Sequence, residues 1–329
     1  MEYVRLGKTG LPVSRLCLGT MTFGLQCDEP TSFQILDKAK ESGVTFIDTA
    51  DVYPLGGDLT TVGRTEEIIG KWMRGRRDQV VLATKCFGVT GTSPWDAGMS
   101  AKHILASIDR SLIRLGTDYV DLYQLHFDDK STPIDETLVA LDSLVRSGKV
   151  RYIGVSNWTA WRLALAIGKA ELRKTAPIVS VQPRYNLLFR SFERDLFPLC
   201  ESEGIGVIPY NPVAGGLLTG KHSPDTEPAE GRFSIGTTAK MYRDRYWHPE
   251  EFEAVEALKG VAHEAGMPLA QMAVGWVLSK PWVTSPIIGA SKPEHLDSAI
   301  AAAGSPLEPD LVAALDQVTH TWRSVDAER

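Results

Sequence analysis

The chain has 329 residues, of which 43% are hydrophobic and 23% are charged, with a formal net charge of −6. This composition is typical of a folded globular protein and provides no basic field for nucleic acid or an anionic membrane surface. The N-terminus lacks the apolar core of a signal peptide, and no run of about 18 apolar residues could span a membrane. We therefore expect a cytoplasmic protein without nucleic-acid or membrane partners.

The cysteines bear on compartment and on metal binding. Cys17, Cys27, Cys86 and Cys200 form no Cys-x-x-Cys pair and lack the spacing of metal ligands. We expect free thiols in a reducing compartment and no metal site.

Along the chain, a β-hairpin around a Gly-flanked turn is expected over residues 3–13, and short apolar runs then alternate with amphipathic helical patterns. The expected strands are residues 15–18, 45–47, 79–83, 119–124, 150–155, 178–181, 206–209 and 283–287. The expected helices are residues 31–42, 64–74, 101–115, 134–147, 160–168, 193–203, 250–265 and 293–302, with further helical patterns at 269–278 and 309–321.

Strict alternation of strands and helices predicts parallel strands with right-handed crossovers. Eight strands and eight helices favour an α/β protein of the (β/α)8 TIM-barrel class, with an extra C-terminal helix, over an open doubly wound sheet. No Gly-x-Gly-x-x-Gly follows a strand, so a dinucleotide-binding Rossmann domain is not supported. Because no linker or repeat divides the chain, residues 1–329 are expected to form a single domain.

Two connections, residues 87–100 and 212–249, are longer than a barrel loop requires, and both follow strands at the face where such barrels build active sites. The second carries an unusual number of cations for an acidic chain: Lys221, Arg232, Lys240, Arg243 and Arg245. This segment is either a solvated excursion or a strap over a phosphorylated ligand.

Polar groups stand at or just beyond the ends of several predicted strands, and four of them suit proton delivery to a carbonyl. Tyr53 is the candidate acid; its free pKa of about 10 is too high for neutral pH. Lys85 could lower that pKa, Asp48 could pair with Lys85, and His126 could hydrogen-bond the carbonyl oxygen. Each residue alone has an ordinary explanation as an ion pair or packing group, but the ordered set on consecutive strands favours a site.

The motifs that contain these residues resemble the aldo-keto reductase superfamily over nearly the whole chain. They are Phe46-Ile47-Asp48-Thr49-Ala50-x-x-Tyr53, Thr84-Lys85, Asp121-Leu122-Tyr123-x-Leu125-His126, Gly154-Val155-Ser156-Asn157, Gly19-Thr20-Met21, Gln182-Pro183-x-Tyr185-Asn186, the run from Tyr210 to Lys221, and Ile288-Gly289-Ala290-Ser291-Lys292. The resemblance implies a barrel whose bottom is closed by the hairpin and which binds extended NADPH.

The resemblance also implies roles for residues. Asp48, Tyr53, Lys85 and His126 correspond to the catalytic tetrad, with Tyr53 as proton donor. The implied contacts to the nicotinamide half of the cofactor are Gly19, Thr20, Met21, Asp48, Ser156, Asn157, Gln182 and the stacking ring of Tyr210. Those to the pyrophosphate and the adenosine 2′-phosphate are Asn211, Pro212, Val213, Ala214, Gly215, Lys221, Arg232, Gly289, Ser291, Lys292 and His295. The cations favour NADPH over NADH, which remains the second candidate.

The sequence departs from the family pattern in places. His295 replaces the usual Gln or Arg, and Ser298 and Ala299 replace a Glu-Asn pair that usually contacts adenine. Pro54-Leu55-Gly56-Gly57 replaces the common turn after Tyr53, which could reshape the substrate entrance. Asn211 stands where Ser is more frequent. The substrate pocket is expected from position to include parts of the segment 212–249 and the residues Met21, Phe23, Tyr53, Phe87, Trp95 and Trp158, although both Trp residues suit ordinary packing equally well.

The function expected from these features is NAD(P)H-dependent reduction of an aldehyde or ketone, with sugars and secondary-metabolite ketones among the candidates. An alternative is an NADPH-binding regulatory subunit similar to potassium-channel β-subunits, although those carry Asn in place of His126. A hydrolase or isomerase would bring paired carboxylates or a metal cluster to the strand ends, and neither is evident. The expected partner is a small-molecule carbonyl compound, and the sequence leaves oligomerisation open.

Overall fold

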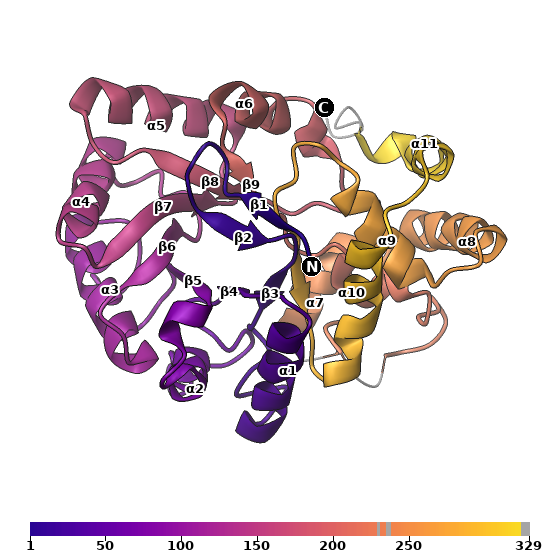
Figure 1. The fold of residues 1–329 in the computed structure, drawn as a ribbon, viewed down its shortest axis with the longest axis horizontal. Helices are drawn as coiled ribbons and strands as arrows, with labels where there is room; N and C mark the ends of the chain where they lie inside the picture. Colours follow the sequence, from indigo (N-terminus) through magenta and orange to yellow (C-terminus); the bar gives the residue numbers. More distant parts are fainter. Residues whose placement is uncertain (229–230, 235–237, 324–329) are drawn as a thin grey trace.

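The computed structural model describes residues 1–228, 231–234 and 238–323. Within them, eight parallel strands form one sheet that curls into a half-barrel (Figure 1). In spatial order these strands are β10 (Ile287–Gly289), β3 (Cys17–Gly19), β4 (Phe46–Asp48), β5 (Val81–Cys86), β6 (Val120–Leu125), β7 (Val150–Ser156), β8 (Ile178–Gln182) and β9 (Gly206–Val207). Parallel bridges from Val207 to Val283 and from Tyr210 to Ile287 link its two edges.

The predicted alternation of strands and helices is confirmed, but several strand bounds are corrected: the strand expected at 79–83 lies at 81–86, the one expected at 15–18 lies at 17–19, and two others are shortened. The last strand was expected at residues 283–287 and instead begins at Ile287, directly after Pro286. The strand expected at 206–209 ends at Val207, two residues before Pro209. Proline has no N–H to donate to a strand ladder, so both strands are shortened on the side of a proline.

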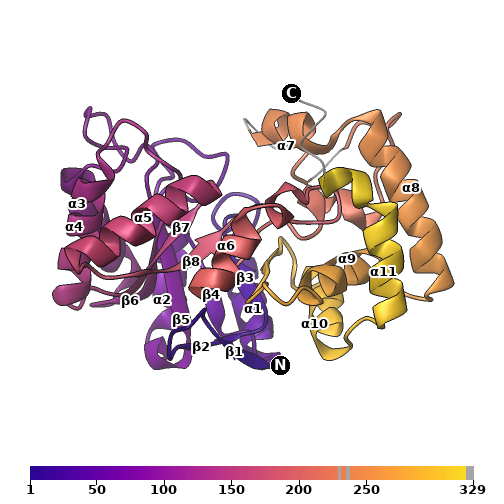
Figure 2. The same cartoon turned by 90° about the horizontal axis from the view of Figure 1, so that it is seen from above.

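Helices surround the sheet on its outer side (Figures 1 and 2). They are α1 (Glu29–Glu41), α2 (Arg64–Met73), α3 (Ala101–Leu115), α4 (Ile134–Arg146), α5 (Ala160–Arg173), α6 (Leu196–Glu203), α7 (Thr238–Tyr246), α8 (Pro249–Glu264), α9 (Leu269–Leu278), α10 (Asp297–Gly304) and α11 (Pro309–Val318). Short 3-10 turns occur at Arg77–Gln79, Ser191–Glu193, Ala214–Thr219, Pro293–Leu296 and His320–Arg323. No helix of the described chain is long and apolar enough to cross a membrane.

Helix α3 illustrates why the predicted helices form. Ile104, Ile108 and Leu112 recur at helical spacing and are buried on one face. Ser100 caps the first turn by accepting a hydrogen bond from the His103 N–H, and Gly116 ends the helix in the left-handed conformation at φ 63°. Helix α3 has the predicted bounds because its periodicity and both caps agree.

Helix α7 lies inside the segment 212–249, which was expected to be irregular. Its sequence is strongly polar, and the large side chains that it buries are Tyr242 and Tyr246, one turn apart. Two aromatic residues give too weak a periodicity to identify a helix by pattern. The parts of this segment at 229–230 and 235–237, and residues 324–329 of the expected domain, lie outside the described residues.

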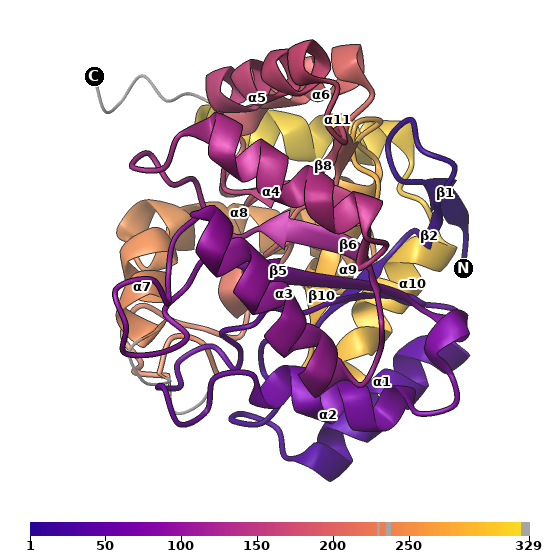
Figure 3. The ribbon, with the colours of Figure 1, turned by 90° about the vertical axis from the view of Figure 1, so that its left-hand side faces the viewer.

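The N-terminal hairpin pairs β1 (Tyr3–Arg5) with β2 (Pro12–Ser14). Its Leu6 and Val13 are fully buried in an apolar cluster inside the curled sheet, together with Phe46, Ala83 and Leu122. The hairpin lies at the amino ends of the strands, whereas α7 lies on the opposite side (Figure 3). The polar groups that end the strands therefore face the side covered by α7.

Candidate active site

A buried ion pair occupies the carboxyl ends of β4 and β5. Asp48 is the last residue of β4 and Lys85 lies near the end of β5; they are 3% and 0% exposed. The Lys85 Nζ donates to Asp48 Oδ2 at 2.5 Å and to the Thr49 carbonyl at 2.9 Å. Burial, the largest single influence, opposes the charged form of Lys85, but the charge of Asp48, the hydrogen bond to it and the nearby Tyr53 together outweigh burial and raise the lysine pKa. Lys85 is therefore an ammonium.

Two glutamines complete the environment of Asp48. Gln124 Nε2 and Gln182 Nε2 both donate to Asp48 Oδ1 at 2.9 Å. Gln182 Nε2 also donates to Gln124 Oε1 at 3.0 Å. Gln182 was expected here, but Gln124 was missed. The available signal was a polar residue next to the end of β6, in register with Lys85 on β5.

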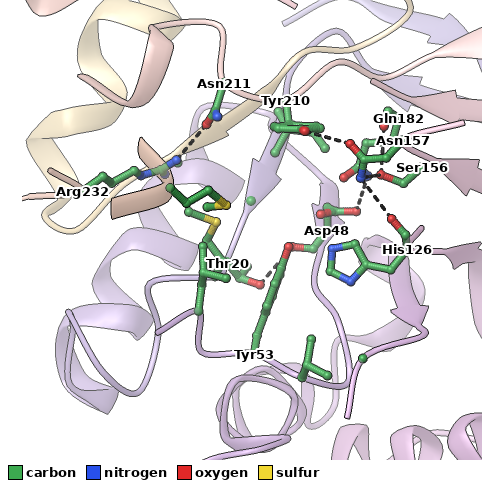
Figure 4. Close-up of a pocket in the computed structure, with 18 of the residues that line it drawn as sticks. Thr20, Asp48, Tyr53, His126, Ser156, Asn157, Gln182, Tyr210, Asn211 and Arg232 are labelled. Atoms are coloured by element: carbon green, nitrogen blue, oxygen red, sulfur yellow. Dashed lines mark hydrogen bonds between the residues drawn. The ribbon is translucent and has the colours of Figure 1, made fainter. Parts of the chain in front are cut away.

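Tyr53 and His126 lie close to Asp48 (Figure 4). The Tyr53 ring centroid is 5.1 Å from the Lys85 Nζ and 5.8 Å from the His126 ring, which meets it edge to face. Burial raises the pKa of the Tyr53 phenol, and the charge of Lys85 lowers it. The expected effect of Lys85 is therefore present, but burial outweighs it and the net shift of the pKa is upward.

His126 is half-buried and directly follows β6. Burial first, and the Lys85 charge second, hold the pKa of its imidazole well below the usual range. The ring is therefore neutral near pH 7, with one nitrogen able to donate and the other able to accept a hydrogen bond. The structure thus brings together all four residues that were expected to deliver a proton.

These groups border a cavity of about 950 Å³, which we call the catalytic cavity. Lys85 lies behind its wall, while Asp48, Tyr53 and His126 line it. Asn157, in the left-handed conformation at φ 59°, connects two walls: its Nδ2 donates to the His126 carbonyl at 3.0 Å, and its Oδ1 accepts from Tyr210 Oη at 2.8 Å. The expected cofactor contacts that line this cavity are Gly19, Thr20, Met21, Asp48, Ser156, Asn157, Gln182, Tyr210, Asn211, Arg232 and Gly289.

A second, larger cavity of about 1560 Å³ adjoins the first, and we call it the adjoining cavity. Both cavities are lined by Asn211, Arg232, Ile287 and Gly289. The expected cofactor contacts that line the adjoining cavity are Asn211, Pro212, Val213, Gly215, Lys221, Arg232, Gly289, Ser291 and His295. Ala214 is fully buried and Lys292 is exposed, and the structure places neither in the lining.

Where the two cavities join, the side chains suit a bound anion. Asn211 is 6% exposed, and its Oδ1 accepts from Arg232 Nη1 at 2.9 Å. Its buried Nδ2 has no hydrogen-bond partner among the described residues, although buried donors are normally paired. A Cβ on Gly289 would lie 2.6 Å from Arg232 Nη2, so glycine leaves room for the guanidinium. An orphaned donor beside a cation fits the phosphates of a dinucleotide.

The expected substrate pocket needs correction. Met21 lines the catalytic cavity, and Phe87 lies next to it, 5.5 Å from the lining ring of Phe127. Phe23 and Trp158 instead belong to the hydrophobic core, and Trp95 is 52% exposed beside Lys102. Position in the chain identified these aromatic residues but not the direction of their side chains. The segment 212–249, parts of which were expected to line the pocket, contributes Met241, Tyr242 and Arg245, which were not identified individually. The lining residues that were missed are Val52, Leu55, Gly88, Phe127 and Ile287.

Comparison with known proteins agrees with this geometry. Residues 15–320 match the Aldo/keto reductase family. The chain is 40% identical to "Uncharacterized oxidoreductase YrpG" of Bacillus subtilis, over 97% of this chain and 96% of that protein. It is 38% identical to "Probable voltage-gated potassium channel subunit beta" of Arabidopsis thaliana, over 92% and 91%. It is 33% identical to "Versiconal hemiacetal acetate reductase" of Aspergillus parasiticus, over 96% of both. The chain is therefore an oxidoreductase that belongs to the aldo/keto reductase family.

Proposed function

We propose that the protein is an NADPH-dependent reductase that converts an aldehyde or ketone to an alcohol, with Tyr53 as the proton donor. The observation that carries this proposal is the buried Asp48–Lys85 pair beside a phenol and a neutral imidazole, all at one edge of a cavity. This set contains an acid, a cation that stabilises its conjugate base, and a hydrogen-bonding group for a carbonyl oxygen.

Each of these residues has a distinct role in the proposed reaction. His126 donates a hydrogen bond that orients the carbonyl oxygen, and Tyr53 transfers its proton to that oxygen as negative charge develops on it. Lys85 stabilises the phenolate that remains, and Asp48 with its two glutamine partners keeps Lys85 in place. Ser156, Asn157 and Gln182 would hold the carboxamide of the nicotinamide, and Tyr210 would contact its ring. Bound NADPH supplies the hydride.

The preference for NADPH is proposed from the adjoining cavity. Lys221, Arg232, Ser291 and His295 supply cations and hydrogen-bonding groups around the place expected for the adenosine 2′-phosphate. A phosphate suits such a set better than a ribose hydroxyl, because charge-assisted hydrogen bonds are about twice as strong as neutral ones. Lys292, although exposed, lies next to Ser291 and is proposed to contribute its charge from the rim.

We propose two further features of the whole molecule. The bridges that link the edges of the sheet indicate a closed (β/α)8 barrel, and residues 1–329 form one domain. The four cysteines are free and buried, which supports a cytoplasmic location.

The decisive experiment is a panel of aldehydes, ketones and sugars assayed for NADPH and NADH oxidation. We expect turnover with NADPH and weaker turnover with NADH. Tight NADPH binding without turnover of any carbonyl would contradict the proposal and favour the regulatory alternative, which is raised by the name of the Arabidopsis relative.

A further inference from the structure

Helix α7 contributes three side chains to the catalytic cavity, from Met241, Tyr242 and Arg245. The Tyr242 hydroxyl already has a partner within the protein, because its Oη accepts a hydrogen bond from Arg232 Nη1 at 2.9 Å. Met241 extends the apolar part of the wall, together with Val52, Leu55 and Phe127. Arg245 is the residue of this helix that the proposed mechanism does not use.

The Arg245 guanidinium is half-buried and makes no hydrogen bond or ion pair with any described residue. Its neighbour Asp244 accepts from Lys240 Nζ at 2.6 Å instead. The carboxylate that lines the catalytic cavity, Asp48, already accepts from Lys85, Gln124 and Gln182. Because a partly desolvated cation without a partner is unfavourable, this arrangement calls for an anion from outside the chain.

Neighbouring cations are engaged within the protein. Arg232 donates to Asn211 and Tyr242. Arg243 forms an ion pair with Glu227 and donates to the Phe233 carbonyl at 2.8 Å. Arg232 and Arg243 therefore have partners within the protein, whereas Arg245, which also lines the catalytic cavity, has none among the described residues.

The position of Arg245 separates it from the place expected for the adenosine 2′-phosphate. It lines the catalytic cavity but not the adjoining cavity, where Lys221 and Ser291 are found, whereas Arg232 at the junction lines both. Its charge also acts on Tyr210 at the nicotinamide end, where it opposes the effect of burial. An anion bound by Arg245 would therefore belong to the carbonyl compound.

We propose that Arg245 selects the substrate by pairing with a carboxylate, so that the preferred substrates are aldehydes or ketones with an apolar body and a carboxylate remote from the carbonyl. This inference rests on the proposed reductase function. A guanidinium can bind a carboxylate through two parallel hydrogen bonds, which also fixes the orientation of the substrate. The apolar wall opposite would hold the hydrocarbon or aromatic part.

The test compares para-formylbenzoate with its methyl ester, which have similar bodies but differ in charge. We expect wild type to prefer the anion in kcat/KM, and Arg245→Met to reduce that preference by about 10- to 100-fold through KM. Arg245→Lys should restore part of it. Lys240→Met is the matched control, because Lys240 is an exposed cation on the same helix that is paired with Asp244; it should leave the preference unchanged.

The outcomes separate this inference from the proposed function. Turnover with equal preference in wild type and Arg245→Met would overturn the role of Arg245 and leave the reductase intact. A large loss of NADPH affinity in Arg245→Met, with an unchanged preference, would also overturn it and assign Arg245 to the cofactor. If no carbonyl is reduced, calorimetry with benzoate decides: binding that is lost in Arg245→Met supports the anion site, and absence of binding to wild type overturns it.

Discussion

Two regions form the catalytic cavity, and they differ in how their charges are satisfied. The strand-end rim (Asp48, Lys85, Gln124, His126 and Gln182) is largely buried, and the charges of Asp48 and Lys85 are saturated by hydrogen bonds within the protein. The described part of the strap, residues 212–228, 231–234 and 238–249, carries half-buried or exposed cations, and the orphaned amide of Asn211 directly precedes it. The rim is therefore satisfied within the protein, whereas we propose that the strap is completed by its ligands.

Tyr53→Phe tests the chemical role of the rim and should have the largest effect. Removing the phenolic hydroxyl should lower kcat by about 10²- to 10⁴-fold, because that is the usual contribution of a positioned acid. NADPH affinity should remain nearly unchanged, since the ring itself is retained. Stopped-flow hydride transfer and fluorescence titration of NADPH measure the two quantities. A near-normal kcat would remove Tyr53 from the mechanism.

Lys85→Met tests whether pairing makes the buried charge of Asp48 tolerable. Loss of the ammonium leaves a buried carboxylate with only amide partners, so the free energy of unfolding should fall by about 3–5 kcal/mol. The double variant Asp48→Asn/Lys85→Met removes both charges and should recover much of that stability. Urea unfolding of wild type, Asp48→Asn, Lys85→Met and the double variant provides the comparison, and equal losses in Lys85→Met and the double variant would contradict the pairing argument.

The same contrast explains what could be predicted from the sequence. Asp48, Lys85 and His126 were predictable because apolar strands stop at them, and the end of a parallel strand fixes where its last side chain lies. Gln124 was missed because its role depends on the register between β5 and β6. Arg245 and Met241 could not be assigned to the cavity, because α7 is polar and its helical pattern depends on two tyrosines. Interactions between segments distant in sequence decided these positions.

Arg232→Met tests the strap as the phosphate-binding region. We expect a loss of about 10- to 100-fold in NADPH affinity, as for a charge-assisted hydrogen bond, with a much smaller loss for NADH. Lys292→Met should show the same preference more weakly, because its side chain is exposed and outside the cavity lining. Equilibrium titrations with both cofactors distinguish the cases. Equal losses for NADPH and NADH would refute the contact to the 2′-phosphate.

Asp51 is a second buried carboxyl group, in the turn that follows Asp48 at the end of β4. It is fully buried, and neither carboxylate oxygen has a partner among the described residues. Burial, and secondarily the charge of Glu66, raise its pKa well above the usual range. A raised folded-state pKa means that stability is lost as the pH rises from the unfolded value near 4 through the folded value.

Asp51→Asn, which resembles the protonated acid, should therefore increase the free energy of unfolding at pH 8 by about 1 kcal/mol. The increase should shrink as the pH falls toward 4, and denaturant unfolding across this range measures it. A variant that is destabilised at pH 8 would show that the ionised carboxylate is required.

The hairpin has a consequence for chemistry at the opposite end of the molecule. Leu6 and Val13 pack against Phe46, Ala83 and Leu122, each of which stands two residues before Asp48, Lys85 or Gln124 on its strand. Residues two apart on a strand face the same way, so the hairpin supports the layer directly beneath the reacting groups. The hairpin thus completes an apolar layer beneath the site. Loosening this layer would let water screen the attraction between Asp48 and Lys85, and the reaction rate would fall without any change to a reacting side chain.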